Sequence, residues 1–304
     1  MIAQADTAPG RRRIVAIVNP VSGRRNMLPV VPKLSEALTT LGGHLEWSVT
    51  AGIGHATELA ASLPDDTHAV LAVGGDGTVC EVINGLGGRP VPLAILGTGT
   101  ENLLARELRM PRRISQLAAT LLNGETFAYD VGLMNQRRFL AVAGIGFDAE
   151  CVRRLATARR GHITHWNYFW PILHTFWNHE FPTLDVATDG QPAFHGQAFA
   201  LVGVIPRYPA WLRLLAEARY DDGLLDVCIL PCDSRRQLLA HTVRAFGRAH
   251  VDRGGVIYRQ CRSATVTSPE QVPIQLDGDD GGELPASFEI LPASVTFLRP
   301  PRKG

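Results

Sequence analysis

The first 110 residues alternate short apolar runs with segments of helical spacing, and this alternation constrains the fold more than any other feature. Residues 14–18 and 69–73 are short runs of β-branched or small apolar residues that end at turn residues. This pattern predicts buried strands. In residues 30–41 the apolar side chains recur with helical spacing. Further strands are expected at 45–50 and 93–96, and further helices at 55–63, 79–86 and 103–108. Because strands that alternate with helices form parallel sheets, we predict a doubly wound α/β domain.

From about residue 130 the pattern changes to strands with few helices between them. The strand candidates are 139–143, 198–205, 225–230, 264–267 and 287–291, and one helix is expected at 162–177. We therefore predict an α/β domain over residues 1–130 and a mainly antiparallel β-sandwich domain over residues 131–291. The last strand candidate, 294–298, fits either domain, so residues 292–304 could complete the first.

Charge and cysteine content exclude several classes of protein. Thirty basic and twenty-nine acidic residues give a net charge of +1, and basic residues do not interleave with aromatic ones, so nucleic acid is not an expected partner. The five cysteines are widely spaced, as reduced cytosolic thiols are. No secretion signal and no apolar run of about 18 residues are seen. We expect a cytoplasmic protein, with any membrane contact peripheral and at the inner face. A homodimer is compatible with the sequence.

The strongest local motif is Gly-Gly-Asp-Gly-Thr at residues 74–78, directly after one expected strand and before the next helix. Glycines let a ligand approach the backbone, and the amides at a helix start favour an anion such as phosphate. A carboxylate beside phosphates needs a cation or a transferable proton, so solvent-facing Asp76 is assigned to magnesium handling or to base catalysis. Taken alone, the motif is equally well explained as a tight turn.

Two further polar loops favour the ligand-binding interpretation. Asn-Pro-Val-Ser-Gly at 19–23 and Gly-Thr-Gly-Thr-Glu-Asn at 97–102 also follow expected strands. In an open parallel sheet, ligands bind outside the carboxyl ends of the strands, so the three loops are expected to line one crevice. The chain has neither a standard P-loop nor a dinucleotide fingerprint, and the protein-kinase motifs are missing as well.

In this order the three loops resemble the catalytic domain of the diacylglycerol kinase family, which includes sphingosine kinases and bacterial lipid kinases. The resemblance continues through Gly-Ile-Gly-Phe-Asp-Ala at 144–149, Asp-Asp-Gly-Leu-Leu-Asp at 221–226 and Leu-Asp-Gly-Asp at 276–279, and so covers most of the chain. It implies that an α/β domain binds ATP with Mg²⁺ and that a β-rich domain supplies lipid-binding and catalytic groups.

The resemblance also implies roles for single residues. Those implied to bind ATP are Asn19, Pro20, Ser22, Gly23, Thr50, Gly74, Gly75, Asp76, Gly77, Thr78, Glu81, Thr100 and Asn102. Asp148 is implied to bind the lipid, and Asp222 with the carbonyl of Leu224 to bind magnesium, although a plain hairpin turn explains that segment equally well. The family's usual Asp-Gly-Glu is Asp277-Gly278-Asp279 here, so both acidic residues remain candidates for the base. The neighbouring glycines predict that they lie on a flexible loop.

We therefore predict an ATP-dependent lipid kinase that transfers the γ-phosphate to a hydroxyl of diacylglycerol or of a sphingoid-like lipid. Two alternatives stay open. An NAD kinase-like enzyme would share the motif at 74–78, whereas a catalytically inactive nucleotide or lipid sensor would explain the shortened acidic motif. Residues 165–181 hold seven of the 21 aromatic residues, either as a lipid-facing surface or as a helix packed on the second domain.

Overall fold

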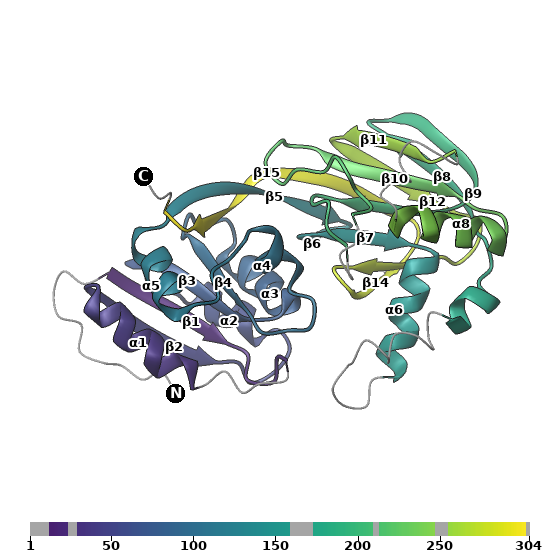
Figure 1. Ribbon diagram of the computed structural model, residues 1–304. Helices are drawn as coiled ribbons and strands as arrows, with labels where there is room; N and C mark the ends of the chain where they lie inside the picture. The colour runs from purple at the N-terminus through teal and green to yellow at the C-terminus, as the bar shows by residue number, and fades with distance from the viewer. Residues whose placement is uncertain (1–11, 24–28, 159–172, 209–212, 247–254, 302–304) are drawn as a thin grey trace. The chain divides into compact units, whose positions relative to one another are not determined.

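The computed structural model describes residues 12–23, 29–158, 173–208, 213–246 and 255–301 (Figure 1). By packing, the chain divides into two compact units. Unit 1 comprises Met1–Tyr129 with Ala293–Gly304, and unit 2 comprises Asp130–Pro292. The boundaries expected from sequence lie one residue from this division. Two long strands, β5 (Glu125–Met134) and β15 (Ala286–Arg299), contribute residues to both units.

Unit 1 is built on a parallel sheet. Its strands lie in the order β2 (Gly43–Val49), β1 (Arg12–Val18), β3 (Thr67–Gly74), β4 (Leu93–Gly97) and the last part of β15. The central strands are buried on both faces, which explains why they read as unbroken apolar runs in the sequence.

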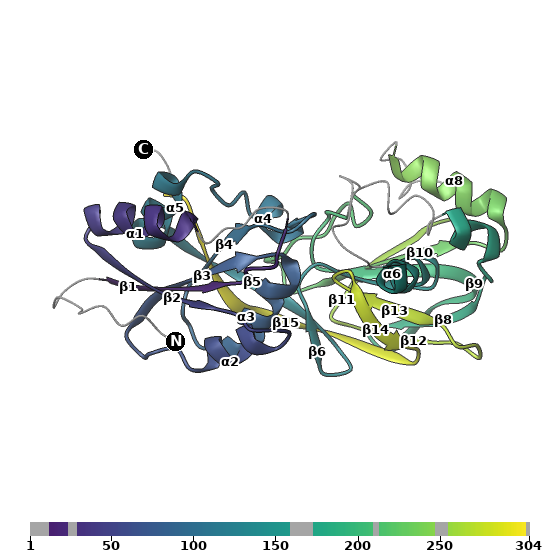
Figure 2. The ribbon, with the colours of Figure 1, turned by 90° about the horizontal axis from the view of Figure 1, so that it is seen from below.

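Helices cover both faces of this sheet, so the predicted doubly wound α/β fold is confirmed. Figure 2 shows α1 (Val30–Thr40) and α5 (Ile114–Asn123) on one face, with α2 (His55–Ala61) and α3 (Asp76–Leu86) on the other. The inward residues of α1 are Val31, Leu34 and Leu38, whose spacing places them on one side of the helix. They pack in one buried cluster with side chains of α5 and of the sheet.

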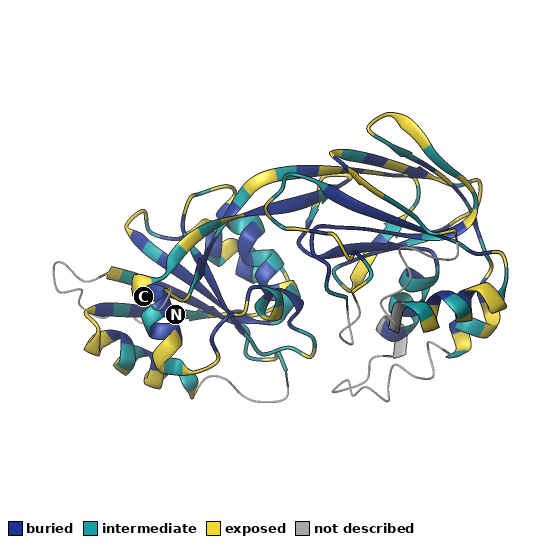
Figure 3. Ribbon diagram, turned by 45° about the horizontal axis from the view of Figure 1, so that its top comes forward, coloured by how far each residue is buried: buried dark blue, intermediate teal, exposed yellow. Residues whose placement is uncertain are grey.

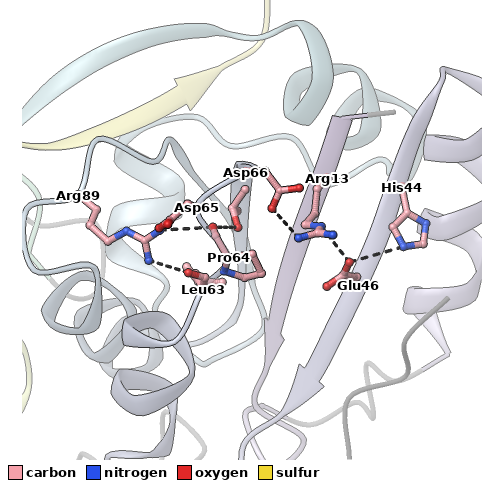
Figure 4. A network of polar contacts seen from close by, with 9 residues as sticks. Arg13, His44, Glu46, Leu63, Pro64, Asp65, Asp66 and Arg89 are labelled. Atoms are coloured by element: carbon pink, nitrogen blue, oxygen red, sulfur yellow. Dashed lines mark hydrogen bonds and ion pairs between the residues drawn. The ribbon is translucent and has the colours of Figure 1, made fainter. Parts of the chain in front are cut away.

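The amino end of this sheet carries a network of paired charges (Figure 4). The Arg13 guanidinium lies 3.0 Å from Glu46 and 2.5 Å from Asp66, and His44 lies 3.8 Å from Glu46. Nearby, Arg89 pairs with a carboxylate in the loop before β3. These ion pairs lie at the amino end, whereas the glycine loops follow the strands at the opposite, carboxyl end.

Unit 2 is antiparallel throughout its described pairings, and its strands include both alternating and continuously buried ones (Figure 3). One layer joins β8 (Thr183–Thr188), β12 (Ser263–Thr267) and β15, and β6 (Arg137–Phe139) pairs with β5. The other joins β14 (Asp279–Glu283), β13 (Pro273–Leu276), β7 (Val142–Ile145), β10 (Leu225–Pro231) and β11 (Ile257–Cys261). The long strand β9 (Gln191–Gly203) pairs with β8 at one end and with β7 and β10 at the other. The predicted mainly antiparallel second domain is confirmed.

Unit 2 contains two helices that the sequence does not predict. Helix α6 (Phe147–Ala158) follows β7, and α8 (Arg235–Phe246) follows β10. Their arginines and other polar residues hide the helical spacing of the apolar ones. The expected helix at 162–177 lies mostly outside the described residues, although residues 173–178 are helical. Within the described ranges, no helix is both long and apolar enough to cross a membrane.

Candidate active site

The three glycine loops of unit 1 meet at the carboxyl end of the parallel sheet. A Cβ on Gly99 would lie 2.9 Å from the Cα of Gly75, so the loops after β3 and β4 are in contact there. A Cβ on Gly23, which has a φ of +80°, would overlap the carbonyl oxygen of Thr98. Only glycine allows backbones to approach this closely. The structure thus brings together the loops that the sequence places in one crevice.

Asn19 ties the first of these loops to the start of α3. Its backbone N–H donates to Val73, the last buried residue before the glycines of β3, at 2.8 Å, and its Nδ2 donates to the Oγ1 of Thr78 at 3.0 Å. Its Oδ1 accepts the N–H of Val21 at 3.1 Å. Thr50 is nearly buried beside the end of β1, where its N–H donates to the carbonyl of Val18. The side chains of Asn19 and Thr78 therefore hold the loops together.

Asp76 caps a neighbouring helix instead of facing solvent. Its carboxylate accepts the N–H of Leu103 at 3.0 Å and of Leu104 at 3.2 Å, at the start of α4 (Leu103–Glu107). Burial raises the pKa of Asp76, and the hydrogen bonds from these amides oppose that rise. The expected solvent-facing position is wrong, because the residue is half-buried and both oxygens have backbone partners. Its role in magnesium handling or catalysis stays a prediction.

Glu81 makes the equivalent contact with α2. Its two carboxylate oxygens accept the N–H of Gly54 at 3.0 Å and of Ala56 at 3.2 Å. The free amides at a helix start carry partial positive charge, so a carboxylate there stabilises the helix. Helix α3 thus supplies an acidic residue to the starts of both α2 and α4. The ATP-binding role implied for Glu81 stays a prediction.

The other predicted ATP-binding residues differ in their exposure. Asn102 is buried and closes its own loop, since its Oδ1 accepts the N–H of Gly99 at 2.8 Å and its Nδ2 donates to the Gly99 carbonyl at 2.7 Å. Gly77 and Thr100 are exposed. The remaining residues are the buried Gly74 and the half-buried Pro20, Ser22, Gly23 and Gly75. Groups that could face a ligand therefore come mainly from the backbone and the small hydroxyl side chains.

In unit 2 the acidic motif forms a tight hairpin, so the expected flexible loop is wrong. Asp277 and Gly278 have φ values of 52° and 91° and join β13 to β14 in a two-residue turn. Leu276 pairs directly with Asp279 across that turn. Asp-Gly is a favoured pair for turns of this kind, because both positions need a left-handed backbone. Cross-strand pairing outweighs the weak strand propensity of the glycines that follow.

Asp277 and Asp279 have very different surroundings. The Asp277 carboxylate accepts three backbone N–H groups, from Leu140 at 2.6 Å, Ala141 at 2.8 Å and Val142 at 2.9 Å. Three donors take up most of the roughly four lone-pair sites of a carboxylate. Asp279 is exposed and opens β14, and within the described part of the chain its side chain has no hydrogen bond or ion pair. Of the two candidates for the base, Asp279 has the free carboxylate.

Asp148 lies in the first turn of α6, and both of its oxygens are hydrogen-bonded. Its Oδ1 accepts the hydroxyl of Tyr208, and its Oδ2 accepts the Nε2 of Gln275 at 2.8 Å. Burial raises the pKa of Asp148, and the two hydrogen bonds oppose that rise. A Cβ on Gly144 would overlap the Asp148 carboxylate, which explains that glycine of the motif. Tyr208 and Gln275 are not indicated by the sequence, although Gln275 directly precedes the Leu-Asp-Gly-Asp motif.

The segment implied to bind magnesium forms a turn that collects negative charge. Asp222 accepts the N–H of Leu224 at 3.0 Å, and Asp130 accepts the N–H of Gly223 at 2.7 Å. Burial raises the pKa of Asp222, and the charges of Asp130 and Asp221 raise it further. Among the residues that the structure describes, no group of three His, Cys, Asp or Glu side chains is arranged to hold a metal.

Most of the aromatic segment cannot be assigned to a surface or to the core. Trp166, Tyr168, Phe169 and Trp170 lie outside the described residues. Trp177 is 59% exposed, and the Arg235 guanidinium lies 5.9 Å from its ring centre. Both interpretations of this segment therefore stay open.

Comparison with known proteins identifies both units. The family model of the diacylglycerol kinase catalytic domain matches residues 13–134, and that of the YegS C-terminal NAD kinase beta sandwich-like domain matches residues 141–299. A diacylglycerol kinase of Staphylococcus carnosus is 27% identical over 295 residues, which are 95% of this chain and 96% of the relative. One of Staphylococcus epidermidis is 27% identical over 296 residues, covering 95% of this chain and 93% of the relative.

Solved structures show the same fold. A crystal structure of a diacylglycerol kinase from Bacillus anthracis strain Sterne matches with a TM-score of 0.72 at 21% identity, covering 97% of this chain and 99% of that one. A second from the same organism matches with a TM-score of 0.78 at 23% identity over the same shares. Because the two family models cover nearly all of both units, the chain belongs to the diacylglycerol kinase family.

Proposed function

We propose that this protein is an ATP-dependent lipid kinase that transfers the γ-phosphate of ATP to a hydroxyl of diacylglycerol or of a sphingoid-like lipid. Unit 1 binds the nucleotide, and unit 2 binds the acceptor and takes its proton. The observation that carries this proposal is the contrast between Asp277, whose carboxylate is occupied by three amides, and Asp279, whose carboxylate is free. A free carboxylate at a fixed turn suits a general base.

In unit 1 the nucleotide phosphates are held by the glycine loops. Gly75 and Gly99 let the loops after β3 and β4 approach closely, and the amide of Gly77 lies in the first turn of α3, where backbone N–H groups favour anions. Asn19 and Thr78 keep these loops in register through their mutual hydrogen bond. Asp76 and Glu81 act indirectly in this scheme, since each caps a helix beside the loops.

In unit 2 the acceptor hydroxyl is bound near Asp148, and Asp279 accepts its proton. The hydroxyl oxygen forms a bond to the γ-phosphorus, the bond from that phosphorus to the β–γ bridging oxygen breaks, and ADP leaves with the bridging oxygen. Positioning and charge neutralisation account for most of the catalysis in reactions of this type.

Asp222 and the Leu224 carbonyl are suited to hold Mg²⁺. Both are hard oxygen donors, and Asp222 has surplus negative charge around it from Asp130 and Asp221, which a cation would neutralise. One Asp222 oxygen accepts the Leu224 N–H, which fixes the carboxylate while leaving the other oxygen for a ligand. When bound, the ion supplies positive charge that offsets the charge of the phosphates.

The proposal is tested by incubating the purified protein with γ-labelled ATP, Mg²⁺ and a total lipid extract in mixed micelles, and identifying labelled lipids by mass spectrometry. We expect one phosphorylated lipid class, and only a small residual rate of product formation with the Asp279→Asn variant. In a parallel reaction, NAD replaces the lipid as the acceptor. Labelled NADP without labelled lipid would identify an NAD kinase, and ATP binding without consumption in either reaction would identify a sensor. We further propose that the enzyme works in the cytoplasm with peripheral contact to the inner membrane face.

A further inference from the structure

Gln275 connects two parts of unit 2 that the proposed reaction uses. It lies on β13 and is only 2% exposed. Its Nε2 donates to the Oδ2 of Asp148 at 2.8 Å, and its Oε1 accepts the N–H of Gly278 at 2.7 Å. One side chain thus bridges the carboxylate assigned to the acceptor and the turn directly before Asp279.

The chemistry of the two partners determines how this amide is oriented. The backbone N–H of Gly278 can only donate, so the oxygen of Gln275 must face it. The nitrogen of Gln275 then faces Asp148, where it meets an acceptor. A neutral amide is suited to this position because it offers a donor at one end and an acceptor at the other. Glutamate or leucine at position 275 would lose at least one of the two contacts.

The turn that precedes Asp279 is held from two sides. The Asp277 carboxylate binds the amides of residues 140–142, and the Asp277 N–H donates to the Val142 carbonyl at 2.9 Å. On the other side, Gln275 holds the Gly278 N–H. Both turn residues have a left-handed backbone conformation, which is unfavourable in free energy for a residue such as Asp277 and must be held by other contacts. These anchors keep the backbone at Asp279 in one place while its carboxylate stays free.

The far end of the hairpin is attached to the helix that carries Asp148. Arg153 of α6 lies 2.9 Å from Glu283 and 3.3 Å from Asp280, and its Nη2 donates to the Gly282 carbonyl at 2.9 Å. Arg153 therefore aligns β14 with α6 along its length. Gln275 makes the direct connection at the end where Asp148 and Asp279 lie.

We propose that Gln275 is a positioning residue of the phosphoryl-transfer reaction, which sets the separation between Asp148 at the acceptor and Asp279 at the proton to be removed. This inference rests on the proposed lipid kinase activity and assigns a task to a residue outside the family motifs named above. A reacting group displaced by about 1 Å can lose about 100-fold in rate, so a residue that fixes this distance affects turnover without touching the substrate.

The test uses Gln275→Met, which keeps the length of the side chain and removes both hydrogen bonds. We expect kcat with the lipid to fall about 100-fold, as for a displaced reacting group, and the KM for ATP to stay unchanged, because the nucleotide groups belong to unit 1. The matched control is Gln237→Leu. Gln237 also accepts a backbone N–H, that of Asp233 at 2.9 Å, but it lies on α8, and among the described residues it has no hydrogen bond to Asp148. All rates are corrected for the folded fraction measured by circular dichroism.

A merely structural role is distinguished by combining substitutions. In an Asp279→Asn background the base is already missing, so Gln275→Met should lower the residual rate less than twofold. An equal further loss in both backgrounds would overturn the proposal, as would wild-type kcat in Gln275→Met alone.

A second variant keeps the test decisive if Gln275→Met does not fold. Gln275→Glu retains the acceptor for the Gly278 N–H but places a carboxyl group against Asp148. We expect the lipid KM to rise about tenfold while kcat changes less, because the turn is kept and the acceptor side is disturbed. Unchanged lipid KM in this variant would contradict the proposed link. If the wild-type protein phosphorylates no lipid, the proposed function is wrong. That result is obtained before any Gln275 variant is made, so it is distinguishable from a failure of the Gln275 proposal.

Discussion

The carboxylate of Asp76 accepts the backbone N–H of Leu103, so the first residue of α3 caps the first turn of α4. An asparagine can accept at one oxygen only and turns an N–H₂ group towards the second amide of that helix start. Replacing a capping carboxylate or hydroxyl typically costs about 1 kcal/mol. We therefore expect Asp76→Asn to lower the free energy of unfolding by about 1–2 kcal/mol in urea denaturation. Asp65→Asn, at an exposed position, is the control and should change it by less than about 0.5 kcal/mol.

The two acidic residues of the hairpin should separate stability from catalysis. Asp277→Asn leaves at least one of three buried amides without an acceptor, which costs on the order of 1–3 kcal/mol of stability. Asp279→Asn should leave stability within about 0.5 kcal/mol of wild type, since the side chain is exposed, and should slow the chemical step to a small residual rate. Asp279→Glu should retain activity. Urea denaturation and single-turnover phosphate transfer measure the two effects, and a fully active Asp279→Asn variant would remove this residue from the mechanism.

The close approach of Gly23 to Thr98 allows a test of whether the three glycine loops form the nucleotide site. Gly23→Ala forces the first loop away from the third, and we expect ATP affinity to fall more than tenfold. Gly42→Ala is a matched control, because Gly42 has a φ of +83°, close to the +80° of Gly23, but has no atom within 4 Å of the added Cβ. Both variants carry the same backbone strain, so only the loop contact differs. Binding is measured with a fluorescent ATP analogue, and equal affinities in the two variants would argue against these loops as the nucleotide site.

The magnesium dependence of the kinase activity tests whether Asp222 holds the ion. We expect Asp222→Asn to raise the Mg²⁺ concentration needed for half-maximal activity by about 10- to 100-fold, the range typical for loss of an important group at a metal site. Asp65→Asn is the control, since Asp65 is exposed and pairs with Arg89 in unit 1. A magnesium titration at saturating ATP and lipid measures the effect. Identical titration curves for wild type and Asp222→Asn would place the metal elsewhere.

Four of the five thiols should be unreactive in the folded protein. Burial raises the pKa of Cys151, Cys228 and Cys261 to about 12 and that of Cys232 to about 11. At pH 8 the reactive thiolate then amounts to about one part in a thousand or less of each of these groups. A thiol reagent should modify at most one cysteine of the native protein at this pH, with Cys80 the half-buried candidate, and all five after denaturation. Rapid native reaction of three or more would contradict the buried positions.

The parts of this structure that are predictable from sequence are local ones. The strands of unit 1 are continuous apolar runs between turn residues, and the glycine loops follow them at once, so their order and their common edge follow from short segments. Asp277 is different, because its amide partners at residues 140–142 lie about 135 positions earlier in the chain.

The capping roles of Asp76 and Glu81 were hidden for the same reason. In the sequence, Asp76 is assigned to magnesium handling or base catalysis, and Glu81 is implied to bind ATP. Only the packing of α3 against its neighbours shows that backbone amides bind both carboxylates. The strand at β14 was missed because glycines disfavour strands locally, while pairing with β13 decides the outcome.

Unit 1 receives its last parallel strand from β15, where Phe297 pairs with Leu93 of β4. A ribosome makes β4 long before β15, with all of unit 2 between them. During synthesis the open edge of β4 therefore has no partner from its own unit until the whole of unit 2 has emerged. The growing chain must keep that apolar edge from pairing with other polypeptides in the meantime. Unit 1 is therefore completed later than unit 2, although most of it is translated first.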